Sequence, residues 1–226
     1  MLLKTLTAIL LLSAVSGQAA ENQLVLRIKG GWSIPTGELE EKTFTVGDFQ
    51  TIFKSSGVYS LAGEASLRLS ALPFDIALDA GRHLFSDDAF GEIEETTYEY
   101  PTGTGRVTDF HHRIYSFSLK AEMPVALAYR AVTTLGAGFG WYFYKYVNLG
   151  DFDRAGPFPP SHSHPGWQLS LTQTFEIHNR VGLLFAFEYH SFDVGDDDNV
   201  GFAPAGAINR INFYCIHLGL SFRVVN

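Results

Sequence analysis

Hydrophobic and polar residues alternate one by one along eight segments of the chain. From Leu183 to Tyr189, for example, large apolar side chains occupy every second position. Successive side chains on a strand point to opposite faces, so a period of two predicts β-strands. The eight segments are Leu24 to Ile34, Val58 to Ala71, Phe74 to Leu84, His111 to Met123, Leu127 to Tyr146, Trp167 to Ile177, Val181 to Phe192 and Asn209 to Val224.

Long and short connections alternate between these segments. The short ones contain Pro73, Pro124 and His178 to Arg180, and the long ones run roughly over 35–57, 85–110, 147–166 and 193–208. Short turns at one end and long loops at the other are typical of outer-membrane barrels. The pattern therefore predicts an all-β fold: an eight-stranded antiparallel up-and-down transmembrane β-barrel, with both termini at the short-turn end.

The two faces of the predicted strands differ in bulk as well as polarity. An eight-stranded barrel has a narrow interior, which the many Phe, Tyr, Trp and Leu side chains would overfill. The opposite face is rich in Gly, Ser and Thr, which suit a narrow interior. Aromatic residues also fall near segment ends, as in the girdles at membrane interfaces: Trp32, Tyr59, Phe74, Tyr115, Trp141, Phe143, Trp167, Tyr189 and Phe222. We expect the apolar face to meet lipid. The alternative is a soluble barrel of lipocalin type, in which the two faces are inverted.

Charges of both signs share the predicted interior face. A buried charge must be paired, because an isolated one costs several kcal/mol or more. We therefore expect ion pairs that fill the interior, an open water-filled pore being disfavoured at this strand number. The predicted network consists of Arg27, Lys29, Glu64, Arg68, Asp75, Asp79, Lys120, Glu122, Arg130, Glu176, Glu188 and Arg223.

The N-terminus has the plan of a secretory signal. Lys4 precedes an apolar core, and small residues follow before Glu21. That core is too short to span a membrane as a helix. We predict a cleaved signal peptide over 1–20 and a barrel domain over 21–226.

Composition narrows the possible functions. The 226 residues carry a net charge of -8, so there is no basic footprint for nucleic acid. The single cysteine, Cys215, excludes an intramolecular disulfide, and we read it as a small strand residue.

The last strand carries the most specific local feature. His217, Gly219, Phe222 and Val224 follow the order polar, glycine, aromatic, hydrophobic. In this, and in its strand plan from Leu24 to Asn226, the chain resembles the small eight-stranded outer-membrane proteins of Gram-negative bacteria, of transmembrane-domain and opacity-protein type. The chain ends on Asn226, whereas such proteins commonly end on an aromatic residue.

The resemblance implies a place in the cell outer membrane. It also implies that outer-membrane lipid, lipopolysaccharide and the barrel-assembly machinery are partners, that nucleic acid is not one, and that no cofactor is bound. The same four C-terminal residues would be the signal that the assembly machinery reads.

Several polar groupings lack the features of a catalytic or metal site. The run 161–164 holds two histidines but lacks further metal ligands, and the acidic run 196–199 lacks the spacing of a calcium loop. His190 and Ser191 are adjacent, so on a regular strand they face opposite ways. Asp79 with His83, and Glu188 with His190, share a face, but ion pairing in the interior explains them. We therefore predict no catalytic, cofactor or metal site.

Three functions follow from this reading. The first is a non-enzymatic outer-membrane barrel with a structural or surface-interaction role and long loops outside. The second is a narrow channel for small or apolar solutes, with room left by Gly136, Gly138, Gly140 and Gly182. The third is a lipid-modifying enzyme.

Overall fold

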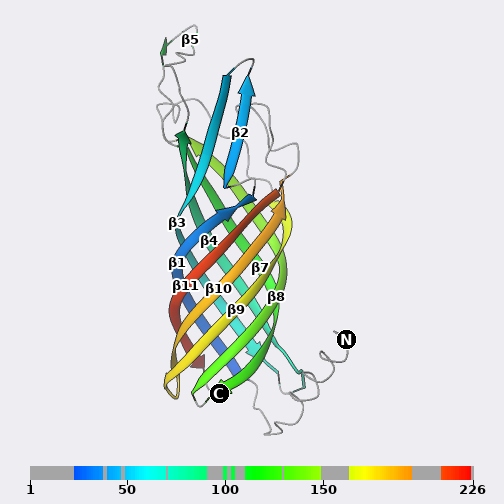
Figure 1. The fold of residues 1–226 in the computed structure, drawn as a ribbon. Coiled ribbons are helices and arrows are strands. Elements are labelled where there is room, and N and C mark those ends of the chain that lie inside the picture. The colour runs from blue at the N-terminus through cyan, green and yellow to red at the C-terminus, as the bar shows by residue number, and fades with distance from the viewer. Residues whose placement is uncertain are drawn as a thin grey trace, which may run out of the picture.

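The fold, given by a computed structural model, is a closed antiparallel β-barrel (Figure 1). The structure describes residues 23–37, 40–46, 49–69, 71–90, 99–100, 103–104, 110–128, 130–148, 163–194 and 210–224. No helix within these ranges is long and apolar enough to cross a membrane. The barrel strands are β1 (Gln23–Thr36), β3 (Phe49–Arg68), β4 (Asp75–Phe90), β7 (Phe110–Ala128), β8 (Ala131–Asn148), β9 (Ser163–His178), β10 (Val181–Asp193) and β11 (Arg210–Val224).

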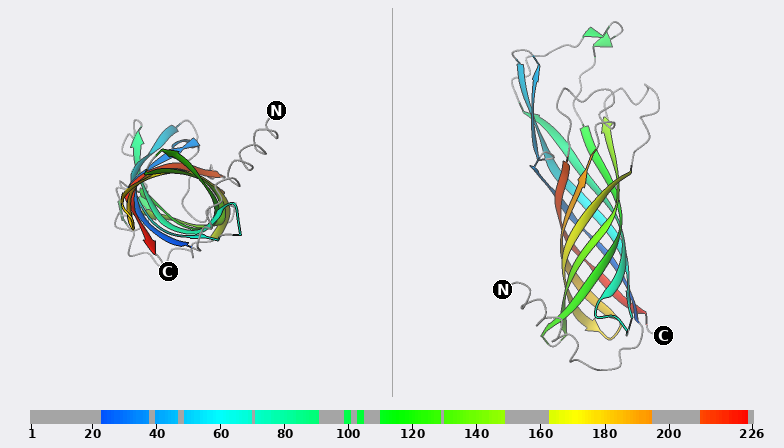
Figure 2. Two further views of the ribbon diagram at one scale, coloured as in Figure 1. Left: turned by 90° about the horizontal axis from the view of Figure 1, so that it is seen from below. Right: turned by 90° about the vertical axis from the view of Figure 1, so that its right-hand side faces the viewer.

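Each barrel strand pairs with its neighbours in chain order, which is the predicted up-and-down topology. The sheet closes where the first and last strands meet, since β1 pairs with β3 on one side and with β11 on the other. In that seam Leu24 lies opposite Val224. The fold class and the placement of both strand termini at one end are therefore confirmed (Figure 2).

Short strands extend beyond the barrel at the end away from the termini. The strand β2 (Glu41–Val46) pairs with the first residues of β3, and β5 (Glu99–Tyr100) pairs with β6 (Gly103–Thr104). Figures 1 and 2 show β2 and the start of β3 rising past the rim. The expected first long connection, 35–57, is thus largely a β-hairpin.

One short turn differs from the prediction. The strand β7 continues past Pro124 to Ala128, and Arg130 forms the turn with a φ of 66°. The pairing of β7 with β4 ends at Glu122, so Pro124 lies where β7 pairs with β8 alone. A strand tolerates proline where one of its sides has no partner strand, because no hydrogen bond is then required from the missing N–H.

The wall of the barrel is apolar outside and mixed inside. Along β1, Ile28 is 60% exposed while Lys29 is 2% exposed, and Trp32 is 62% exposed. Large apolar side chains point outward in the same way on all eight barrel strands. The predicted face assignment is therefore confirmed, and the alternative of a soluble barrel with the faces inverted is wrong.

Candidate functional site: the barrel interior

The interior side chains form three layers along the barrel axis. The inward-facing residues of β11 pass all three levels: Phe213 is apolar, His217 is polar, and Ser221 lies opposite Arg27 of the charged level. From the end away from the termini to the end at which the termini lie, we name the layers the apolar plug, the histidine layer and the charge cluster.

The charge cluster consists of seven buried ionisable side chains: Arg27, Lys29, Glu64, Asp79, Lys120, Glu122 and Glu188. Lys29 Nζ lies 2.7 Å from Asp79 Oδ2, 2.5 Å from Glu188 Oε1 and 3.2 Å from Glu64 Oε2. Every member is at most 7% exposed. Because alternate residues of five strands point inward, groups far apart in sequence meet at one level.

Two further cations, Lys120 and Arg27, complete the cluster. Lys120 pairs with Glu64 and lies 3.4 Å from Asp79 Oδ2 and 3.5 Å from Glu122 Oε1. Arg27 pairs with Glu64 and, at 2.7 Å, with Glu122. The lumen is thus crossed by a continuous set of ion pairs at this level.

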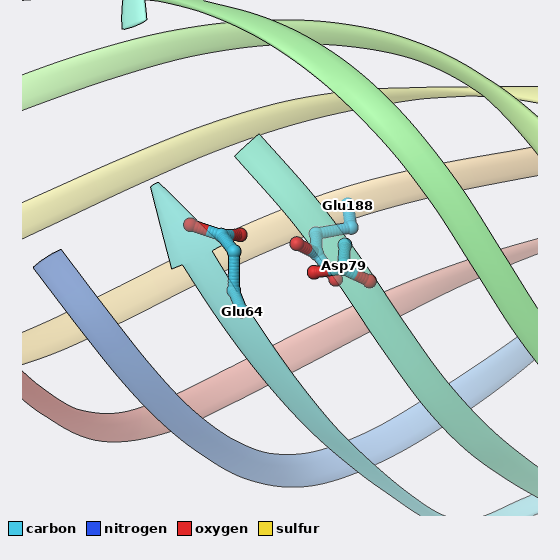
Figure 3. A group of neighbouring side chains, drawn as sticks. All are labelled: Glu64, Asp79 and Glu188. Atoms are coloured by element: carbon cyan, nitrogen blue, oxygen red, sulfur yellow. The ribbon is translucent and has the colours of Figure 1, made fainter. Parts of the chain in front are cut away.

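Three carboxylates of the cluster lie close enough together to hold a cation. Oxygens of Glu64, Asp79 and Glu188 are within 4.8 Å of one another (Figure 3). Lys29 contacts all three of these side chains. Its ammonium group therefore supplies the positive charge that a metal ion would bring.

The cluster as a whole has one more carboxylate than cations. Three cations (Arg27, Lys29 and Lys120) face four carboxylates (Glu64, Asp79, Glu122 and Glu188). The second oxygen of Glu188 faces the histidine layer, 3.2 Å from His217 Nδ1 and 3.8 Å from His190 Nε2.

Five residues of the predicted network lie outside the cluster. Arg68 pairs with Asp75 at 2.9 and 3.0 Å, and Arg223 pairs with Glu176 at 2.5 Å, both close to the terminal end. Arg130 was placed wrongly on the interior face. Its side chain is exposed because the residue forms the β7–β8 turn rather than part of a strand.

The histidine layer is joined by hydroxyl groups. Ser60 Oγ lies 2.8 Å from His83 Nδ1 and 2.7 Å from His217 Nε2. Ser116 Oγ is 3.1 Å from the other nitrogen of His83, and Tyr142 hydroxyl is 3.1 Å from His190 Nδ1. This layer links the charges below to the apolar residues above.

One part of this layer has the atom order of a catalytic triad. Glu188 faces Nδ1 of His217, and Ser60 Oγ contacts Nε2 of the same ring. Such an order activates a serine only where a substrate carbonyl can reach the hydroxyl. Ser60 is 2% exposed, and its oxygen also contacts His83. In this packing the Ser60 hydroxyl is shared between two buried histidine rings and is closed off from solvent.

The apolar plug closes the end of the interior above the histidines. It consists of Phe85, Ile114, Tyr142, Phe192, Val194, Ile211, Phe213 and Cys215. The Tyr142 and Phe192 rings stack with centroids 4.7 Å apart, and Phe213 stacks on His190 at 4.6 Å. Cys215 is fully buried, 3.4 Å from His83 Nδ1.

Sequence reasoning missed the plug because it assigned the bulky apolar side chains to the outside. The residues continue the inward face by steps of two, as Phe85 follows His83 and Phe213 precedes Cys215. Following that parity toward each long connection is the signal that would have found them.

The interior glycines do not leave a channel where they were expected to. A Cβ added at Gly138 would lie 2.6 Å from Lys120 Cγ, and one at Gly182 would lie 2.6 Å from Ser221 Oγ. Atoms of Ser170 and Ser118 crowd the corresponding points at Gly136 and Gly140. Neighbouring side chains and backbone thus already occupy the space that the absent side chains leave.

The residues of the predicted assembly signal divide between the two faces of β11. His217 is buried in the histidine layer, whereas Phe222 and Val224 are 36% and 41% exposed outside. Gly219 packs against the β1 backbone near Ile28 and Lys29, too close for a side chain. Recognition by the assembly machinery stays a prediction.

The remaining sequence candidates lie partly beyond the described ranges. Residues 1–20, His162 and the run 196–199 fall outside them. Ser163 is exposed at the start of β9, and His164 next to it points inward. His190 and Ser191 are both buried.

Comparison with known proteins bears on the fold. No family model and no curated protein matches the chain. Among solved structures, Neisserial surface protein A (NspA) is similar with a TM-score of 0.53 and 11% identity, covering 90% of this chain and 99% of NspA. The outer membrane protein OprG from Pseudomonas aeruginosa is similar with a TM-score of 0.53 and 11% identity, covering 92% and 99%. The chain has the fold of the small eight-stranded outer-membrane β-barrels.

Proposed function

We propose that this protein is an integral barrel of the cell outer membrane. The support is the wall: apolar and aromatic side chains project outward from every barrel strand, where water would disfavour them and lipid would not. A closed barrel also satisfies every backbone group between its strands, as a membrane requires.

Within the membrane the barrel acts as a closed scaffold rather than a channel. The single observation that carries this proposal is the filled interior, where the charge cluster and the apolar plug lie one above the other. A solute would have to break buried ion pairs and displace packed aromatic rings to pass.

The working surface of such a scaffold is the end away from the termini. The β2–β3 hairpin and the β5–β6 pair lie there, beyond the rim (Figure 2). We place this end outside the cell, with a structural or surface-interaction role, and the terminal end in the periplasm.

Two measurements on the purified mature protein test the proposal. Migration on SDS gels, unboiled and boiled, should shift, because closed membrane barrels resist SDS until heated. In planar lipid bilayers the protein should give no discrete conductance steps. Solubility without detergent and no gel shift would overturn the membrane assignment, and steady single-channel steps would overturn the closed scaffold in favour of the channel.

A further inference from the structure

The outer wall carries two arginines that have no anionic partner in the described part of the chain. Arg82 on β4 and Arg113 on β7 project outward, and neither forms an ion pair with any residue that the structure describes. The Nε atom of each is shielded from solvent and has no hydrogen-bond partner. Each guanidinium is therefore available to an anion that the described residues do not supply.

Two aromatic rings flank the Arg82 guanidinium. The Arg82 guanidinium lies 5.6 Å from the Tyr59 ring centroid and 5.9 Å from that of Tyr115. Arg82 is directly opposite Tyr115, and Arg113 is two residues further along the same strand. Diagonal neighbours of this kind are roughly 7–8 Å apart, so both guanidinium groups can reach one phosphate.

A shallow apolar groove, largely open to the outside, lies on the wall next to Arg82. It has a volume of about 320 Å³, and Ile28, Leu61, Gly63 and Ala80 line it together with Arg82 itself. Gly63 and Ala80 are directly opposite each other, and the wall is low there because both side chains are small or absent; a Cβ added at Gly63 would meet nothing within 4 Å. The sides are Ile28 and Leu61, 60% and 56% exposed.

The order of these features along the membrane normal matches that of a lipid. A tilted strand crosses a bilayer in about 9–11 residues. Counted from Phe74 at the terminal end of β4, Arg82 therefore falls near the opposite interface, where phosphates lie. The groove is on the side of Arg82 toward Phe74 and thus toward the membrane centre, where acyl chains lie.

We propose that Arg82 and Arg113 bind the phosphate of an acylated lipid, one acyl chain of which occupies the groove over Gly63 and Ala80. The proposal rests on the membrane location proposed above. A free phosphate ion offers the same charge but leaves the groove empty.

The test is native mass spectrometry of the detergent-solubilised protein with synthetic diphosphorylated lipid A. Its matched ligands are the same lipid without phosphates, and inorganic phosphate alone. Replacing both arginines, Arg82→Gln with Arg113→Gln, should weaken binding of the phosphorylated lipid about tenfold and leave the dephosphorylated lipid unchanged. Gly63→Leu puts a side chain into the groove at a point where an added Cβ would meet no atom within 4 Å, and it should weaken both lipids.

Arg130→Gln is the matched control, because this arginine is exposed at the opposite end of the barrel. It should bind as the unaltered protein does. Equal binding of the phosphorylated lipid by the double variant and the unaltered protein would overturn the proposal, as would inorganic phosphate competing as strongly as the lipid. The SDS gel shift, measured on the same samples, separates this failure from failure of the barrel assignment.

Discussion

The two halves of the barrel interior are filled by different physical means. Toward the terminal end, seven buried charged groups form a connected set of ion pairs, whereas toward the end away from the termini eight side chains form an apolar cluster. The stability of a buried ion pair depends on both members, because removing one leaves the other charge buried without its counterion. Apolar packing degrades more gradually, because each lost side chain removes only its own contacts. The comparison predicts which half tolerates substitution.

The largest effect should come from removing a cation of the charge cluster. Lys29→Met deprives Glu64, Asp79 and Glu188 of their shared ammonium group. We expect a loss of about 3–5 kcal/mol in the free energy of unfolding, measured by urea denaturation in lipid vesicles.

A second variant distinguishes charge imbalance from lost packing as the cause. Lys29→Met combined with Asp79→Asn removes one charge of each sign and should recover part of the stability. If the double variant is no more stable than Lys29→Met alone, the ion-pair account of this half is wrong.

Removing an aromatic side chain from the apolar plug should have the next largest effect. Phe213 packs edge-on against Phe85, with centroids 5.3 Å apart, and stacks on His190. Phe213→Ala should cost about 3 kcal/mol, while Phe213→Leu should cost less because it leaves a smaller cavity. The charge cluster still blocks the lumen, so neither variant should conduct in planar bilayers. Conductance of Phe213→Ala alone would show that the plug is the sole barrier.

A smaller effect is expected in the histidine layer between the two halves. Ser60→Ala leaves nitrogens of His83 and His217 without their hydroxyl partner and should cost about 1–2 kcal/mol. A fluorophosphonate probe should not label Ser60 in the folded protein, because the hydroxyl is buried. Labelling that disappears in Ser60→Ala would instead reveal a reactive serine and favour the enzymatic reading.

The smallest effect is expected at the rim. Arg210 and Asp193 form an ion pair at 2.7 Å, with side chains 59% and 69% exposed. Exposed pairs contribute about 0–1 kcal/mol. The free energy of unfolding of Arg210→Ala should therefore differ from that of the unaltered protein by no more than this amount. A loss comparable to that of Lys29→Met would mean that exposure does not separate the rim from the interior.

The sequence predicts which side chains face outward from the barrel wall, and it predicts only part of how the inward-facing side chains are arranged. Alternation along segments such as 181–192 fixes which face is apolar, so the strands and the lipid-facing wall follow from period alone. The polar positions of the interior also follow, including Lys29 and Glu188. Which of them meet does not, because strand register and tilt decide whether residues of different strands reach the same level.

Turns and apolar interior positions were harder to read, for separate reasons. Pro124 suggested a turn, but it lies on a stretch of β7 that has only one partner strand. Phe213 and Ile114 look like wall residues by size, and only their parity places them inside. At both places the residue type pointed to the wrong location. For Phe213 and Ile114, the position in the alternating pattern points to the correct face.

The seam between β1 and β11 has a consequence for the order of folding. The first strand of the sheet finds one of its two neighbours only when the last strand arrives, across nearly the whole length of the chain. Contacts of such long sequence separation form slowly, because the loop that closes them loses much conformational entropy. Until β11 docks, both edges of the sheet expose unpaired N–H and C=O groups, which lipid cannot satisfy. A chain that stops before β11 therefore ends as an open sheet rather than a smaller barrel.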